Sequence, residues 1–483
     1  MHLSVVLRIT GVLLMLFSFT MVPPLLVSLI YDDGGRDTFL MAFALSLFTG
    51  LFSWLPVQSR KTELRTRDGF LVVVLFWVVL TLFGAIPLVL STHIDMSFTD
   101  AVFESLSGLT TTGATVITHL DDLPKSLLYY RQQLQWLGGM GIVVLAVAVL
   151  PMLGIGGMQL YRAETPGPVK DTKLTPRIKE TAKTLWIIYL TLTVSCGLSY
   201  WWAGMTLFDA ICHSFSTVAI GGFSTHDQSI GYFNSASIEA ITMLFMVLSG
   251  INFALHFLAW RRKSVFHYFR DPEAKLFLFL LFSTAVITCV VLKITGTYDS
   301  WTDSLRYGLF ETISIATTTG YSVANFSLWP SLLPFLLIFA SFAGSCAGST
   351  GGGVKIIRIL LMYKQGLREI KRLIHPNAVI LIKIGSKVVP DRVIEAVWGF
   401  MGVYIALFIF LLMAVMATGI DFDTAFSAVA ASINNLGPGI GAVSEHYGNI
   451  NDYAKWILCF AMLLGRLEVF TLLVLFSPMF WRR

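Results

Sequence analysis

The segment FTDAVFESLSGLTTTG at Phe98–Gly113 is the first of four similar segments that decide the architecture of this chain. The other three are LFDAICHSFSTVAIGG at Leu207–Gly222, LRYGLFETISIATTTG at Leu305–Gly320 and FDTAFSAVAASINNLG at Phe422–Gly437. The four segments align without gaps, and each of them ends in glycine. They recur at a spacing of roughly 100 residues, which indicates four copies of one structural unit.

Each segment is apolar but shorter than the roughly 20 residues that a helix needs to cross a bilayer. Longer apolar stretches flank every one of them, and two more precede the first. These longer stretches predict about ten membrane spans, at 3–30, 38–57, 70–91, 133–158, 184–203, 236–260, 274–296, 330–354, 393–419 and 454–480.

The composition also indicates a polytopic membrane protein. Of the 483 residues, 55% are hydrophobic and only 13% are charged, about half of the roughly 25% that is usual in soluble domains. The apolar stretches recur from end to end, which excludes a soluble enzyme with one anchor, a disordered chain, a coiled coil and a secreted disulfide scaffold. The five cysteines lie singly in apolar stretches and form no CxxC pattern, so they indicate no metal or redox site.

The basic residues predict the orientation. Most of the 34 Lys and Arg residues fall on the side of the membrane that holds both termini, and most of the 29 Asp and Glu residues fall on the other side. Because Lys and Arg concentrate in cytoplasmic loops, both termini are predicted to be cytoplasmic. The outer face is then acidic and would concentrate cations modestly.

We therefore predict an all-α polytopic membrane protein, with four membrane–pore-loop–membrane units around one central pore. Two extra N-terminal transmembrane helices occupy 1–66, and the units occupy 67–160, 161–263, 264–390 and 391–483. Each short helix is predicted to enter from outside and return, because non-helical backbone at that depth must be buried or line a water-filled path. Its predicted N-terminal caps are Thr99, Asp209, Asp303 and Asp423.

The ends of the four loops carry the predicted ion-binding groups. They contain no acid, so their useful groups are backbone carbonyls, and a ring of carbonyls can replace the hydration shell of a potassium ion. Glycine permits backbone angles that turn carbonyls inward. Structural turns alone would not explain four such loops in phase. The predicted filter residues are Thr110, Thr111, Thr112, Gly113, Ala219, Ile220, Gly221, Gly222, Thr317, Thr318, Thr319, Gly320, Asn434, Asn435, Leu436 and Gly437.

With these loops, the chain resembles the Trk/Ktr/HKT superfamily of potassium transporters, and within it the bacterial TrkH-type subunits. The resemblance extends over essentially the whole chain. Besides the four loops it rests on TTTGAT (110–115), IGGFSTHD (220–227), GSCAGSTGGGVKIIR (344–358), HPNAV (375–379), NNLGPG (434–439) and GRLEVFT (465–471).

The resemblance implies a potassium-translocating subunit of the bacterial inner membrane. It implies a homodimer with one pore in each protomer, gated by a cytosolic nucleotide-binding ring of the TrkA type. In this superfamily a glycine in each filter loop accompanies potassium selectivity, and a serine in the first loop accompanies sodium permeation. Gly113 occupies that first position here.

A run of small residues interrupts the predicted span 330–354. Each glycine costs a helix about 1 kcal/mol relative to alanine, and in the lipid core such a run is tolerated only beside a cavity. We predict a flexible loop that obstructs the pore below the filter, as the resemblance also implies; the alternative is a close-packing face between helices. The predicted gate residues are Gly344, Ser345, Cys346, Ala347, Gly348, Ser349, Thr350, Gly351, Gly352 and Gly353.

Arg466 is a charge near the middle of the last predicted span, which by default indicates a function. The resemblance places it in the pore below the filter, as a positive barrier to permeation. The alternatives are an ion pair with Glu311, snorkelling to the membrane surface, or an ion pair with Glu468, which is disfavoured because residues i and i+2 of a helix do not face each other. Glu104 and Glu311 occupy equivalent positions on the short helices, where they either hydrogen-bond filter backbone or raise the cation density, or else serve as buried structural acceptors behind the filter. His213 occupies the same position in the second unit and is predicted to be structural.

These features predict potassium uptake through a carbonyl-lined filter, driven by the membrane potential. A proton- or sodium-coupled potassium symporter is the alternative. An enzyme is not expected, since no HExxH or GxSxG motif occurs. Potassium is the predicted ion, and no organic cofactor is expected because nucleotide would bind the cytosolic partner. The basic segment 355–392 is predicted to contact lipid headgroups and that partner; nucleic-acid binding is not expected.

Overall fold

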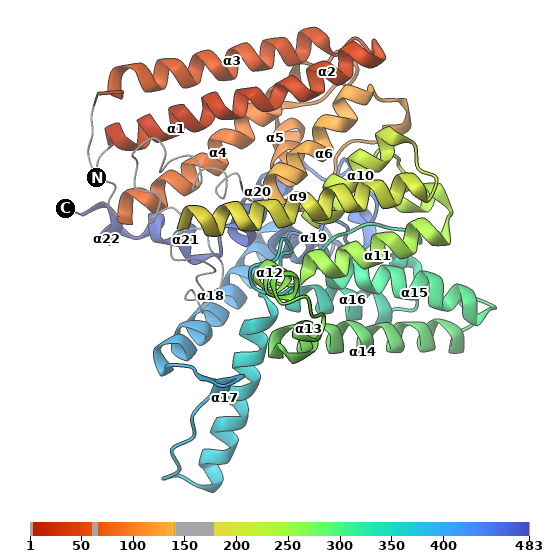
Figure 1. Cartoon of the computed structure of the whole chain (residues 1–483), viewed down its shortest axis with the longest axis vertical. Helices are drawn as coiled ribbons and strands as arrows, with labels where there is room; N and C mark the ends of the chain where they lie inside the picture. The colour runs from red at the N-terminus through yellow and green to blue at the C-terminus, as the bar shows by residue number, and fades with distance from the viewer. Residues whose placement is uncertain (1–2, 60–65, 140, 142–177, 483) are drawn as a thin grey trace.

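The computed structural model describes residues 3–59, 66–139, 141 and 178–482, and the regular secondary structure in this part is helical with one exception (Figure 1). The exception is a short antiparallel hairpin of β1 (Lys383–Ile384) and β2 (Lys387–Val388). The predicted all-α membrane architecture is confirmed. Six described helices are long and apolar enough to cross a membrane, or up to eight if each of two bent helix pairs counts as one span.

Two N-terminal helical spans pack against each other ahead of the repeated units. The first joins α1 (Leu3–Ser18), η1 (Phe19–Met21) and α2 (Val22–Tyr31), and the second joins α3 (Arg36–Trp54) and η2 (Leu55–Val57). Gly11 and Gly50 mark their closest approach, since a Cβ atom on either would lie 2.8 Å from the carbonyl oxygen of the other. Small residues let membrane helices approach this closely.

Each of the four units contains three main helices in chain order, which we call the outer helix, the short helix and the inner helix. The outer helices are α4 (Thr66–Leu90), α9 (Ile178–Trp202), α14 (Pro272–Ile294) and α18 (Asp391–Met416). The short helices are α5 (Phe98–Leu109), α10 (Leu207–Ala219), α15 (Trp301–Ala316) and α19 (Phe422–Asn434). The inner helices are α6 (Lys125–Gly139), α11 (Ala236–Gly250), α16 (Leu332–Ala343) and α20 (Asp452–Arg466).

Contacts between units close the four into a ring. Each inner helix packs against the short helix of its own unit and against the short helix of the next: α6 contacts α10, α11 contacts α15, α16 contacts α19, and α20 contacts α5. The last contact joins the end of the chain to the first unit. The loops that follow the short helices therefore meet around one axis. Short 3-10 turns occupy the return segments: η3 (Leu120–Asp122), η5 (Ser229–Phe233), η6 (Phe326–Leu328) and η7 (Gly441–Val443).

The continuous spans predicted at 236–260 and 454–480 are wrong. α11 ends at Gly250 and bends by 97° into α12 (Phe253–Arg261), whose first turn is capped by Asn252. α20 bends by 109° into α21 (Phe470–Leu473) and η8 (Val474–Phe476). The apolar content of a whole span does not reveal such breaks, because Asn252 at the first and Glu468 at the second each stand among apolar neighbours. The predicted span 133–158 lies largely outside the described residues.

The predicted interruption of 330–354 is present. α16 ends at Ala343, and the chain resumes helical structure only at α17 (Ile356–Ile374). α17 projects away from the helical bundle, and the β1–β2 hairpin returns the chain to α18 (Figure 1). Two short helices complete the described chain, α13 (Phe266–Arg270) and α22 (Pro478–Trp481).

The predicted caps of the short helices are wrong by two or three residues. Side chains at Ser97, Thr206, Ser300 and Asp421 accept the N-terminal backbone N–H bonds. Asp100, Asp209 and Asp303 instead lie in the first turn, where each accepts a hydrogen bond from the capping hydroxyl. Carboxylates in the first turn are stabilised by the positive end of the helix dipole.

Candidate functional site

The four loop ends share one backbone conformation. In every loop the second and fourth residues have positive φ angles, between 55° and 97°. The third residue of every loop returns its N–H to the carbonyl of its short helix, at 2.7 to 2.9 Å. The residues with positive φ are Thr111, Ile220, Thr318 and Asn435 at the second position and Gly113, Gly222, Gly320 and Gly437 at the fourth. The loops predicted from the sequence are thus four copies of one structure.

The fourth-position glycines touch the neighbouring loops in a closed cycle. A Cβ atom on Gly113 would meet the carbonyl oxygen of Gly221, and one on Gly222 would meet that of Thr319. In the same way Gly320 faces the carbonyl of Leu436 and Gly437 faces that of Thr112. All four approaches are closer than the 3.0 Å that Cβ atoms keep. The third-position carbonyls therefore form one ring, and only glycine fits beside each of them.

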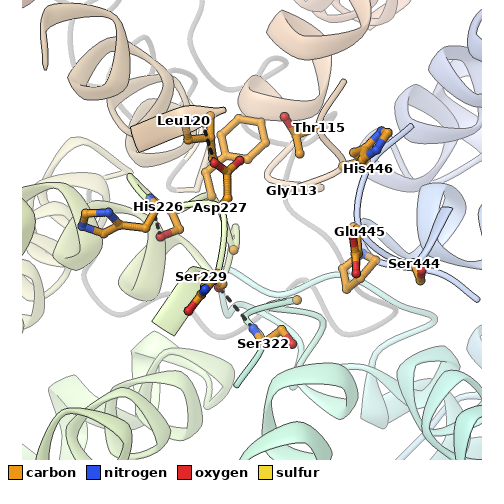
Figure 2. A pocket seen from close by; sticks show the side chains of 18 of the residues that line it. Gly113, Thr115, Leu120, His226, Asp227, Ser229, Ser322, Ser444, Glu445 and His446 are labelled. Atoms are coloured by element: carbon orange, nitrogen blue, oxygen red, sulfur yellow. Dashed lines mark hydrogen bonds between the residues drawn. The ribbon is translucent and has the colours of Figure 1, made fainter. Parts of the chain in front are cut away.

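A cavity of about 880 Å³ opens on one side of this ring, the side that the sequence predicts to face out of the cell. Its lining includes all four fourth-position glycines, and Figure 2 shows side chains from all four units around it, among them Asp227, Ser322 and Glu445. Asp227 accepts a hydrogen bond from the backbone N–H of Leu120 in the first unit, at 2.9 Å. The cavity thus presents carboxylates to solvent above the ring of carbonyls.

Side chains of the short helices hold the segments that follow the loops. Glu104 accepts a hydrogen bond from the N–H of Val116 at 2.9 Å and forms a buried ion pair with Arg131 at 2.7 Å. Glu311 accepts hydrogen bonds from the N–H groups of Val323 and Ala324. Both carboxylates are therefore buried acceptors behind the loops, which was one of the two predicted alternatives.

His213 takes the equivalent place in the second unit. Its ring nitrogens lie 2.9 Å from the carbonyl oxygen of Asp209 and 2.9 Å from the hydroxyl of Ser224. In the fourth unit Ser427 accepts a hydrogen bond from the N–H of Ile440 at 2.8 Å. Each unit thus braces its return segment from the short helix, with glutamate in the first and third units, histidine in the second and serine in the fourth.

The glycine-rich segment between α16 and α17 lies against the inner ends of three short helices. The Ser345 hydroxyl donates to the carbonyl of Thr317 at 3.0 Å, and the Thr350 hydroxyl donates to that of Val218 at 2.9 Å. The N–H of Gly353 donates to the carbonyl of Asn434 at 3.1 Å. The segment therefore touches the second, third and fourth units from the side opposite the cavity.

Arg466 lies against the remaining unit. Its guanidinium donates to the Thr111 hydroxyl at 3.4 Å and to the carbonyls of Gly138 and Gly139, and it lies 5.6 Å from the ring centre of Trp77. Glu468 forms its ion pair with Arg358. The structure thus brings the predicted filter, the glycine-rich segment and Arg466 together around one axis.

The sequence did not single out Glu273, which holds the glycine-rich segment at Ala347 and the start of α17 at Ile357. This buried carboxylate at the start of α14 accepts a hydrogen bond from the N–H of Ala347 at 2.6 Å and another from that of Ile357 at 3.2 Å. Lys355 donates to the carbonyl of Gly351 at 2.6 Å. A charged residue at a helix start is common, so nothing in the sequence near Glu273 indicates these contacts.

Comparison with known proteins agrees with this architecture. The sequence model of the TrkH family, described as a cation transport protein, matches residues 35–483. The chain is 60% identical over 483 residues to the Trk system potassium uptake protein TrkH of Halomonas elongata, and 54% identical over 482 residues to that of Escherichia coli, each time over the full length of both proteins.

Solved structures give the same relationship. The crystal structure of the potassium transporter TrkH from Vibrio parahaemolyticus superposes with a TM-score of 0.91 at 52% identity, covering all of both chains. The chain thus agrees with TrkH proteins in sequence and in fold over its entire length. This chain belongs to the TrkH family of cation transport proteins.

Proposed function

We propose that this chain is the potassium-translocating subunit of a Trk-type uptake system. The observation that carries the proposal is the closed cycle in which each fourth-position glycine faces the third-position carbonyl of the next loop. A ring of carbonyls replaces the hydration shell of a potassium ion. The relatives named above are potassium uptake proteins, which supports the same ion for this chain.

In this proposal ions enter through the outer cavity and lose water among the four loops. The carboxylates of Asp227 and Glu445 raise the local cation concentration. The filter consists of Thr110–Gly113, Ala219–Gly222, Thr317–Gly320 and Asn434–Gly437. The inward electrical potential supplies about 2.3 kcal/mol per charge for every 100 mV.

The glycine-rich segment Gly344–Gly353 serves as the gate. It contacts three units on the inner side of the loops, so an ion leaving the filter meets it directly. Its many glycines allow several backbone conformations at little cost. Arg466 occupies the inner side of the first unit, where a fixed positive charge opposes cation passage.

The proposal includes an assembly and an orientation. We infer a homodimer in the bacterial inner membrane, with both termini in the cytoplasm and a TrkA-type nucleotide-binding ring beneath it. α1 begins and α22 ends at the same end of the bundle, which supports placing the termini on one side (Figure 1). The basic residues of 355–392 would meet lipid headgroups and the ring. The units keep the predicted divisions 67–160, 161–263, 264–390 and 391–483.

Flux of rubidium-86 into proteoliposomes tests the proposal. Purified protein, alone and with the cytosolic ring, is assayed against competing potassium, sodium and lithium. We expect flux that potassium suppresses most strongly and that increases in Arg466→Ala. If the purified protein alone gives no flux but gives flux once the ring is added, the gate is closed in the protein alone. Absence of flux in both conditions contradicts the proposal, and a reversal potential that moves with pH or sodium supports the coupled symporter.

A further inference from the structure

The second loop differs from the first and third at one position. Its third residue is Gly221, where the first and third loops carry Thr112 and Thr319. Gly221 has no positive φ, in contrast to its neighbour Gly222. The backbone at position 221 would therefore accept a side chain, and its glycine needs another explanation.

The side chain of Gln135 supplies that explanation. A Cβ atom added to Gly221 would collide with Cδ and Oε1 of Gln135 and would lie 2.8 Å from its Nε2. Gln135 belongs to α6, the inner helix of the first unit, and its side chain is fully buried. A glycine at 221 thus makes room for a glutamine from the neighbouring unit.

The amide of Gln135 pairs with the backbone on both sides of Gly222. Its Nε2 donates to the carbonyl of Gly221 at 2.6 Å, and its Oε1 accepts from the N–H of Phe223 at 3.0 Å. The two backbone partners fix which end of the amide is oxygen and which is nitrogen. The amide thus pairs with the loop backbone through one donated and one accepted hydrogen bond, as a neighbouring β-strand would. This pairing fixes the direction of the Gly221 carbonyl.

The first and third loops are braced differently. There the hydroxyls of the first and third threonines bond to each other, at 2.7 Å between Thr110 and Thr112 and at 2.8 Å between Thr317 and Thr319. The second loop has Ala219 and Gly221 at these positions and cannot make this bond. The second loop receives its brace instead from Gln135.

We propose that Gln135 is a positioning residue that sets the ion selectivity of the filter. The Gly221 carbonyl that it holds is the oxygen facing Gly113, so it lies where the first and second loops meet. Discrimination between potassium and sodium depends on the number and placement of carbonyl dipoles around the ion. Without the hydrogen bond from Gln135, the Gly221 carbonyl can move closer to sodium, the smaller of the two ions. This inference rests on the proposed function of the four loops.

The test measures rubidium-86 flux in proteoliposomes with potassium or sodium as competitor. Gln135→Met keeps the size of the side chain and removes both hydrogen bonds. We expect the preference for potassium over sodium to fall by about tenfold, the scale of one lost buried hydrogen bond, while flux continues. Gln133→Met is the matched control, because the Gln133 amide bonds the carbonyl of Thr20, far from the loops along the chain. Its selectivity stays that of the unaltered protein.

Three outcomes separate this inference from the proposed function. An unaltered protein without potassium-competed flux contradicts the proposed function itself. Potassium-competed flux in the unaltered protein, with the same ion preference in Gln135→Met, overturns the role of Gln135. If Gln135→Met does not yield folded protein, the pair Gly221→Ala and Gly221→Ala/Gln135→Ala decides. We expect the double variant to regain the flux that Gly221→Ala loses, with weaker selection for potassium; no regain overturns the inference.

Discussion

Arg358 and Glu468 form an ion pair of 2.8 Å that joins the segment after the glycine-rich loop to the segment after Arg466. The guanidinium of Arg358 also donates to the carbonyl of Val354 at 2.9 Å and lies 4.1 Å from the ring centre of Phe400. Arg358 is 7% exposed, so its charge depends on this partner. The two elements that cover the inner side of the four loops are therefore connected.

Removal of the acid at this connection is expected to open the pathway. In Glu468→Gln the buried Arg358 loses its carboxylate, and breaking one side of a buried ion pair is strongly destabilising. We expect rubidium-86 leak through the protein alone to rise several-fold. Asp391→Asn is the control, since it removes an ion pair between Arg368 and an acid that is 71% exposed. Equal leak in both variants would show that the connection does not hold the pathway closed.

The ring of glycines predicts a graded response to alanine. Gly113→Ala, Gly222→Ala and Gly320→Ala place a Cβ atom deepest against a neighbouring carbonyl, whereas at Gly437 the contact is 2.7 Å. We expect the first three to abolish potassium-selective flux and Gly437→Ala to retain the most. Potassium-competed rubidium uptake measures the order.

Gly419→Ala is the control that separates crowding from backbone strain. Gly419 has a φ of 93°, close to the 97° of Gly437, but a Cβ atom there meets nothing within 4 Å. Alanine in this conformation costs about 1 kcal/mol wherever it occurs. Gly419→Ala should therefore lose some thermal stability and keep its selectivity. Loss of selectivity in Gly419→Ala would assign the effect to strain rather than to the carbonyl ring.

The sequence predicted the repeated units because their signal is local and occurs four times. Each short helix lies within a few residues of its predicted range, and the four loop-end glycines share a positive φ angle. The caps were missed because Ser, Thr and Asp occur both before and within the first turn, and all of them are favourable there. Composition cannot choose between such neighbours.

The contacts that brace the site could not be predicted, since they join distant parts of the chain. Gln135 reaches Gly221 across 86 positions, and Glu273 reaches Ala347 across 74. Neither residue has an unusual type for a helix. The breaks after Gly250 and Arg466 were also missed, because the polar residues at them, Asn252 and Glu468, stand singly among apolar neighbours.

The hydrogen bonds that Glu273 accepts indicate a second way to loosen the glycine-rich segment. In Glu273→Gln the amide can still accept from Ala347 and Ile357, but it loses the charge that strengthens both bonds. We expect a leak above that of the unaltered protein, with unchanged preference for potassium. Glu369→Gln is the control, because Glu369 is 52% exposed on α17. A change in ion preference in Glu273→Gln would indicate that the loops above are disturbed as well.

His226 connects the first two units at the outer cavity, where solvent pH reaches it. Its ring contacts the carboxylate of Asp121, lies 3.5 Å from that of Asp209 and stacks on Tyr232 at 3.5 Å between ring centres; His213 lies behind it. Burial lowers the pKa of His226, but hydrogen bonds and charges from Asp209 and Asp121 outweigh it and raise the pKa above 6.5. The protonated ring is thus the form that joins the two units.

A raised pKa of His226 in the folded protein fixes the direction in which stability changes with pH. The stabilisation from His226 is complete below the unfolded pKa of about 6.5 and is lost as pH rises through the higher folded value. Thermal unfolding in detergent should therefore show a larger deficit of His226→Gln at pH 6 than at pH 9. His375→Gln, at an exposed position after α17, should show no such dependence. A deficit that grows with pH would mean that the neutral ring makes the stabilising contact, and the assigned ion pairs would then be wrong.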